Sequence, residues 1–222
     1  MIRILKQSEI SMAEILSRGE AQNSEKIEAA VAAILADVRE NGDAAVRRYT
    51  EKFDGATLMD ARVSEAEMAA AMAGADAQFI ETLQLAAENI RAFHARQIRQ
   101  NFVVNDTAGV VLGQKITPIA RVGLYVPGGT ASYPSSVLMN AIPAKLAGVE
   151  ELVMVTPPDA NGAINPAILT AANVAGVTAI YKMGGAQAIA ALAFGTATVP
   201  KVEKITGPGN IFVTLAKKAV IG

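Results

Sequence analysis

The sequence predicts an α/β fold in which a Rossmann-like domain, built on a parallel sheet, follows a mostly helical α/β half-domain. Residues 1–118 carry 30 of the 41 charged side chains, whereas all nine prolines lie from Pro118 onward and residues 119–222 hold 12 of the 18 glycines. From residue 119 an apolar β-type run, a turn rich in glycine or proline and an alanine-rich run follow one another four times. We therefore expect two domains, residues 1–118 and 119–222.

Two helices are predicted at the start of the first region from apolar residues at helical spacing. The first should follow a candidate N-cap at Ser24 and stop at Asn41–Gly42, after which Asp43 can cap a short second helix. The residues expected on the buried faces of these two helices are Ile27, Val31, Ile34, Leu35, Val38, Val46, Tyr49 and Phe53.

A capping box and a longer helix come next. Ser64 and Glu67 have the spacing of a capping box, in which each side chain bonds the other residue's backbone N–H. The longest helix of the region is expected over residues 76–97, with its last turn near His94.

Short strands are expected over residues 57–63 and 102–114, the latter as a hairpin that turns near residues 106–109. If the first region is an incomplete half of a larger domain, both segments should present unpaired edges that are prone to association.

The second region repeats strand and helix. Its strands are predicted at Arg121–Val126, Leu152–Thr156, Thr178–Met183 and Val202–Thr206. Its helices are predicted at Ser135–Ala147, Pro166–Ala175, Ala186–Phe194 and Asn210–Val220. Strands this continuously apolar are typical of a parallel sheet covered on both faces. Right-handed crossovers then place every strand-to-helix turn at one edge of the sheet.

Three of these turns favour a nucleotide site. They are Tyr125–Gly129, Gly184–Gln187 and Gly207–Asn210. Glycine lets a phosphate approach the backbone, and the N–H groups that open a helix attract an anion. The candidate cofactor-binding glycines are Gly128, Gly129, Gly184, Gly185, Gly207 and Gly209.

Other interpretations of these turns stay open. There is no complete G-x-G-x-x-G fingerprint and no P-loop, so the glycines can equally serve tight turns. Asp159 can bind a ribose hydroxyl, or it can be an acidic residue of a surface turn. Ser132, Ser135 and Ser136 are better explained as helix caps than as nucleophiles.

Composition excludes several kinds of chemistry. With no cysteine and one histidine, His94, the chain has no thiolate zinc site, no cysteine nucleophile and no pair of histidine ligands. His94 itself fits a helix end better than a ligand site. A net charge of −1 without a basic run argues against nucleic acid. The sequence has no signal peptide and no long apolar span, so we expect a cytoplasmic protein that does not contact a membrane.

A further signal comes from four long segments, which are residues 38–54, 122–148, 184–196 and 202–213. They closely resemble histidinol dehydrogenases, and the resemblance runs from about residue 25 to the last residue. It implies an NAD-dependent enzyme of histidine biosynthesis that oxidises L-histidinol to L-histidine through the aldehyde, with a zinc ion and as a homodimer. The residues that match the family's dinucleotide contacts are Tyr125, Gln187 and Asn210.

The resemblance also implies what this chain lacks. The family's zinc ligands and its acid–base residues have no counterpart here, so no catalytic or metal-binding residue is assigned. We therefore expect the N-terminal part of a histidinol dehydrogenase, with the NAD site and no activity of its own. The alternatives are a nucleotide-binding protein without enzymatic activity, or a subunit completed by a second chain.

Overall fold

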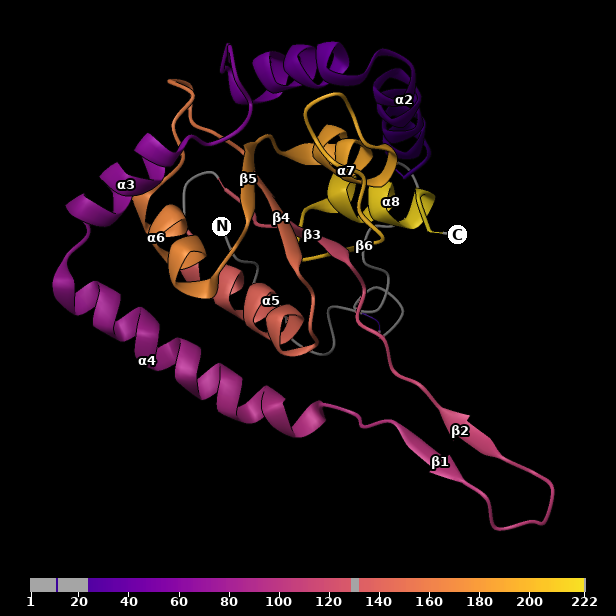
Figure 1. The fold of residues 1–222 in the computed structure, drawn as a ribbon. Helices are drawn as coiled ribbons and strands as arrows, with labels where there is room; N and C mark the ends of the chain where they lie inside the picture. Colours follow the sequence, from indigo (N-terminus) through magenta and orange to yellow (C-terminus); the bar gives the residue numbers. More distant parts are fainter. Residues whose placement is uncertain (1–10, 12–23, 129–131, 222) are drawn as a thin grey trace.

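A four-stranded parallel sheet forms the centre of the molecule (Figure 1). The structure is a computed structural model, and it describes residue 11, residues 24–128 and residues 132–221. The strands lie in the order β5-β4-β3-β6. Their bounds are β3 Arg121–Tyr125, β4 Glu151–Thr156, β5 Ala179–Lys182 and β6 Lys204–Thr206.

All four predicted strands of the sheet are confirmed, with small shifts at their ends. The largest shift is at β6, which was expected to begin at Val202. Val202 instead donates its backbone N–H to Leu192 O and is buried. Its apolar side chain therefore belongs to the core although its backbone does not belong to the sheet.

Both faces of the sheet are buried, as parallel strands require. Leu152 and Met154 of β4 lie in one core cluster, whereas the alternating residues Val153 and Val155 lie in the other. The first cluster is completed by α5 (Pro134–Leu146) and α6 (Pro166–Ala175). The second is completed by α7 (Gly185–Phe194) and α8 (Ile211–Ala219).

The caps of these helices differ from expectation at α5. Its N-cap position is Tyr133, and no side-chain cap bond is made there. Capping by Ser132, Ser135 or Ser136 was therefore wrong, because Pro134 begins the helix and its fixed φ suits the first helical position without a cap.

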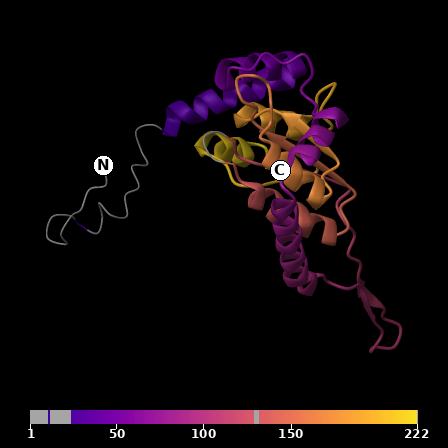
Figure 2. The same ribbon diagram turned by 90° about the vertical axis from the view of Figure 1, so that its left-hand side faces the viewer.

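The N-terminal helices form an outer layer on both sides of the sheet (Figures 1 and 2). Helix α2 (Ser24–Asp54) packs on α7 and α8, whereas α3 (Glu65–Gly74) and α4 (Ala77–His94) pack on α6 and α5. A 3₁₀ turn, η2 (Ala95–Gln97), extends α4. Helices α2–α4 thus add a second helical layer on each side of the sheet. The domain boundary near residue 118 stays a prediction.

The two helices predicted before residue 55 form one element with a kink. Gly42 has φ 50° and ψ −129° inside α2, so the predicted stop marks the bend. Asp43 does not cap the second part, since no described backbone N–H donates to its side chain, and its Oδ1 instead accepts a hydrogen bond from Thr198 Oγ1 at 2.8 Å. The Ser24 side chain lies outside the described residues. The capping box at Ser64 is confirmed, since Ser64 and Glu67 bond each other's backbone N–H at 2.9 and 3.2 Å.

The predicted hairpin is confirmed as β1 (Phe102–Val104) paired with β2 (Leu112–Gln114). It projects from the body of the molecule, and all six of its strand residues are exposed (Figures 1 and 2). Within the described part of the chain no third strand joins this sheet.

Residues 57–63 do not form the predicted unpaired strand. Only Arg62 makes a β-bridge, antiparallel to Tyr181 of β5. The backbone N–H of Val63 also donates to the carbonyl oxygen of Ile180, and the backbone N–H of Lys182 donates to the carbonyl oxygen of Ala61. This segment therefore covers the outer edge of β5 instead of leaving an edge open.

Candidate functional site

The strand order creates a ligand-binding position at the carboxyl edge of the sheet. The chain leaves β3 for β4 on one side, and it later crosses from β5 to β6 on the other side of β3. The crossovers therefore diverge between β3 and β6. Open α/β sheets bind ligands at such a switch point, outside the carboxyl ends of the strands.

A cavity of about 610 Å³ lies at this position. All four strand-to-helix turns contribute to its wall, and so does the C-terminal end of α2. The lining residues are Ile34, Phe53, Asp54, Tyr125, Pro127, Gly128, Pro157, Pro158, Gly185, Ala186, Gln187, Asn210 and Phe212. The cavity brings together Tyr125, Gln187 and Asn210, which the sequence places on three separate turns.

Tyr125 ends β3 and is 4% exposed. Its hydroxyl accepts a hydrogen bond from the backbone N–H of Gly185 at 3.2 Å, at the beginning of α7. Burial raises the pKa of Tyr125, the Gly185 bond lowers it, and the charge of Asp54 raises it again. The phenol therefore stays protonated, and it can still donate its own hydrogen.

Gln187 lies in the first turn of α7 and is 1% exposed. Its Oε1 is buried and has no hydrogen-bond partner. Leaving a buried amide oxygen unpaired costs about 1–3 kcal/mol. A polar group that enters the cavity and bonds this amide would recover that cost.

Asn210 has a structural function as well as a place in the cavity wall. Its Oδ1 accepts a hydrogen bond from Val213 N at 3.1 Å and so caps α8. Lys217 of the same helix donates from Nζ to Gly207 O at 2.7 Å, which closes the turn after β6. No described residue bonds the amide nitrogen of Asn210, which leaves it as a donor for a ligand.

Close packing within the chain accounts for the glycines of these turns. A Cβ atom on Gly128 or on Gly184 would lie 2.7 Å from a ring carbon of Pro157. One on Gly207, which has φ +115°, would overlap the backbone of Tyr125, and one on Gly209 would overlap the side chain of Val213.

Gly185 has φ +63°, and a Cβ atom there would lie 2.6 Å from Gln187 Oε1. Gly129 lies outside the described residues. The turn-packing interpretation is thus sufficient for the five glycines that are described, and a role for them in phosphate binding stays a prediction.

Asp54 also lines the cavity and is not among the residues predicted from the sequence. It is the last residue of α2, it is half-buried, and its Oδ2 has no hydrogen-bond partner. Burial raises the pKa of Asp54 to about 6. A signal was present in the sequence, because an acid just before the helix-stopping Gly55 stands where the helix dipole disfavours negative charge.

Asp159, the acid that the sequence offered for a ribose, does not line the cavity. It is exposed, and its Oδ1 accepts hydrogen bonds from Asn161 N and Ala163 N, both at 2.9 Å. The surface-turn alternative therefore describes it.

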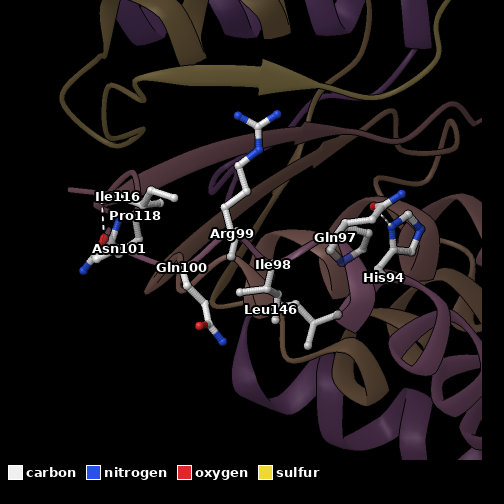
Figure 3. A pocket seen from close by; sticks show the side chains of 11 residues that line it. His94, Gln97, Ile98, Arg99, Gln100, Asn101, Ile116, Pro118 and Leu146 are labelled. Atoms are coloured by element: carbon white, nitrogen blue, oxygen red, sulfur yellow. Dashed lines mark hydrogen bonds between the residues drawn. The ribbon is translucent and has the colours of Figure 1, made fainter. Parts of the chain in front are cut away.

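A second cavity of similar volume, about 610 Å³, lies between the end of α4 and the end of α5 (Figure 3). Two hydrogen bonds join residues of its wall. His94 Nδ1 lies 2.7 Å from Gln97 Oε1, and Asn101 Oδ1 accepts from Ile116 N at 2.5 Å (Figure 3). His94 is in the last turn of α4, which is the helix-end position expected for it.

Among residues 11, 24–128 and 132–221, no group of three His, Cys, Asp or Glu side chains could hold a metal ion. In the same ranges no helix has the length and apolar character needed to cross a membrane.

Comparison with known proteins identifies the family. The histidinol dehydrogenase family model matches residues 17–222. The chain belongs to the histidinol dehydrogenase family. Histidinol dehydrogenases are oxidoreductases of histidine biosynthesis.

Individual relatives agree with this assignment. A histidinol dehydrogenase of Chlorobaculum tepidum is 58% identical over 189 residues, which are 85% of this chain and 44% of the relative. One of Syntrophotalea carbinolica is 54% identical over 96% of this chain and 49% of the relative. The crystal structure of histidinol dehydrogenase from Elizabethkingia anophelis aligns with a TM-score of 0.86 and 45% identity, covering 90% of this chain and 46% of that one.

The chain thus spans about half the length of the histidinol dehydrogenases it matches. These matches fit an N-terminal portion of the family's enzyme, as the resemblance implied. The α/β fold with a parallel sheet is likewise confirmed by the solved neighbour.

Proposed function

We propose that this chain carries the NAD site of a histidinol dehydrogenase, in the cavity at the carboxyl edge of the sheet. The observation that carries the proposal is the buried, unpaired amide oxygen of Gln187 in the wall of that cavity. A polar ligand that bonds this oxygen is the simplest reason to keep such a group in the cavity wall.

The residues present fit a dinucleotide. Tyr125 and Asn210 each bring a polar side chain from a neighbouring turn to the same cavity as Gln187. Gly184, the N-cap residue of α7, has no side chain to cap the helix, and the Tyr125 hydroxyl bonds only the Gly185 N–H. The other N–H groups of this first turn favour a phosphate nearby. Gly128, Gly129, Gly207 and Gly209 complete the proposed binding turns.

When bound, NAD accepts the hydride that leaves an alcohol or an aldehyde. The function of this chain's residues in that reaction is to hold and orient the cofactor. Gln187 would bond it through the amide, Asn210 through its amide nitrogen and Tyr125 through its hydroxyl.

The described residues do not fit a zinc site, since they contain no group of three metal-ligating side chains. We infer that the zinc ligands, the acid–base residues and the contacts with L-histidinol are not supplied by this chain. Oxidation of histidinol would need a longer chain or a second one, and the homodimer that the resemblance implies belongs to that complete enzyme.

Isothermal titration of the purified chain with NAD tests the cofactor site. We expect saturable binding to one site, weakened about tenfold in Gln187→Ala because a hydrogen bond to the ligand is lost. Gln97→Ala is the matched control, since Gln97 lines the other cavity and its loss should leave the affinity for NAD unchanged. Absence of binding by the unmodified chain would overturn the proposal.

A turnover assay tests the second part of the proposal. With L-histidinol, NAD and zinc, the 222-residue chain should produce no NADH above the background without protein. Steady NADH formation that depends on protein concentration would show that the chain contains catalytic residues which we have not assigned.

A further inference from the structure

Asp54 stands out in the cavity because it comes from a different part of the chain than the turns. Helix α2 crosses α7 and α8 and ends at the carboxyl edge of the sheet, where Gly55 with φ +70° turns the chain away. Asp54, Phe53 and Ile34 of α2 therefore form the wall of the cavity that faces the four turns.

The carboxylate of Asp54 is unsatisfied, unlike those of comparable acids. Asp159 accepts two backbone hydrogen bonds, and Asp43 accepts one from Thr198. No described residue donates to Asp54, and Oδ2 is buried without a partner. A buried carboxylate oxygen without a donor is costly, so its retention beside a cavity points to a donor on the ligand.

The charges around the cavity restrict what that donor can be. Asp54 is the one acidic residue among the lining residues given above, which include no lysine, arginine or histidine. A carboxylate with no cation beside it repels phosphate and attracts hydroxyl groups. The pair of hydroxyls on a ribose offers two donors to one carboxylate group.

We propose that Asp54 accepts a hydrogen bond from the adenosine ribose of the dinucleotide and thereby selects NAD over NADP. The proposal rests on the NAD site proposed above and adds a specificity residue to it. In many dinucleotide-binding folds an acidic residue about 20 residues after the glycine turn has this function. Here the acid would come from an N-terminal helix that precedes the sheet in the chain.

Titrations with NAD and with NADP test this proposal. In Asp54→Ala, the affinity for NAD should fall about tenfold, because a charge-assisted hydrogen bond is lost. The affinity for NADP should stay the same or rise, because the carboxylate no longer repels the 2′-phosphate. In Asp54→Asn, the ratio of the two affinities should also move toward NADP.

Asp106→Asn is the control for the loss of one negative charge. Asp106 lies in the exposed turn between β1 and β2, far from the cavity lining, and both affinities should be unchanged. Circular dichroism of each variant checks that it is folded.

Three outcomes would overturn the proposal. Unchanged NAD affinity in Asp54→Ala would show that Asp54 does not contact the ligand. An equal loss of NAD and NADP binding would show that Asp54 acts on the structure of the site and not on the ribose. If the unmodified chain binds neither dinucleotide, the NAD site itself fails, and this proposal fails with it.

Discussion

The central sheet and the β1–β2 hairpin use similar apolar strand residues in opposite environments. Leu124 of β3 is 0% exposed, whereas Leu112 of β2 is 63% exposed. The sheet is buried because helices cover both of its faces, and the hairpin has no such cover in the described part of the chain. An apolar β-type segment therefore predicts a strand, and only the elements packed around it decide whether it belongs to a core.

The sharpest test of this comparison exchanges leucine for alanine in both places. Leu124→Ala should lower the free energy of unfolding by about 2–5 kcal/mol, because it leaves a cavity between the sheet and α5. Leu112→Ala should change it by less than about 0.5 kcal/mol, because the side chain is largely in solvent already. Urea unfolding of both variants gives the two values. Similar losses would mean that the hairpin is buried in solution.

A smaller difference is expected between two glycines with positive φ. Gly207→Ala should cost about 2–4 kcal/mol, because φ is +115° and the new Cβ would overlap the backbone of Tyr125. Gly109, in the hairpin turn with φ +79°, has nothing within 4 Å of such a Cβ, so Gly109→Ala should cost only about 1 kcal/mol. Thermal melts compare the two variants. Equal shifts in melting temperature would show that the backbone moves to remove the overlap between the new Cβ and Tyr125 without a loss of stability.

The smallest expected effect is a change in the free energy of unfolding with pH, which distinguishes Asp54 in the cavity from Asp106 in the hairpin. Burial raises the pKa of Asp54 to about 6 from an ordinary value of 3.8, so the folded protein holds this proton more tightly than the unfolded chain. The resulting stabilisation is complete below about pH 4 and is lost as the pH rises through 6. A shift of this size on a fully buried group corresponds to about 3 kcal/mol, and exposure of the half-buried side chain reduces it to about 1 kcal/mol.

Unfolding in urea at pH 4 and at pH 7.5 measures this effect. From pH 4 to pH 7.5, the free energy of unfolding of Asp54→Asn should rise by about 1 kcal/mol relative to that of the unmodified chain, because the amide does not ionise. The control Asp106→Asn should follow the unmodified chain at both. Parallel behaviour of the two variants would contradict the raised pKa.

The sequence predicted the elements that depend on local pattern. Ser64 and Glu67 form their capping box because both partners lie within one turn of helix. Pro166 begins α6 as predicted, and Gly176, with φ +74°, follows its last residue as a C-cap. These signals act over a few residues, so no tertiary contact was needed to interpret them.

The sequence could not predict features that depend on distant packing. Residues 57–63 looked like a strand, but only Arg62 lies in bridging position against β5. Similarly, Asp54 meets Tyr125 and Gln187 in one cavity only because α2 packs across α7. The site residues on the turns were predictable because parallel strands share an edge, whereas a wall supplied by another helix leaves no comparable pattern.

Pro157 has a mechanical consequence for the proposed site. Its ring packs against Gly128 after β3 and against Gly184 after β5, so one residue contacts two turns that are far apart in sequence. Both turns thus pack on one proline ring without a ligand. A cavity wall that is already packed before binding reduces the conformational entropy that is lost when a ligand binds.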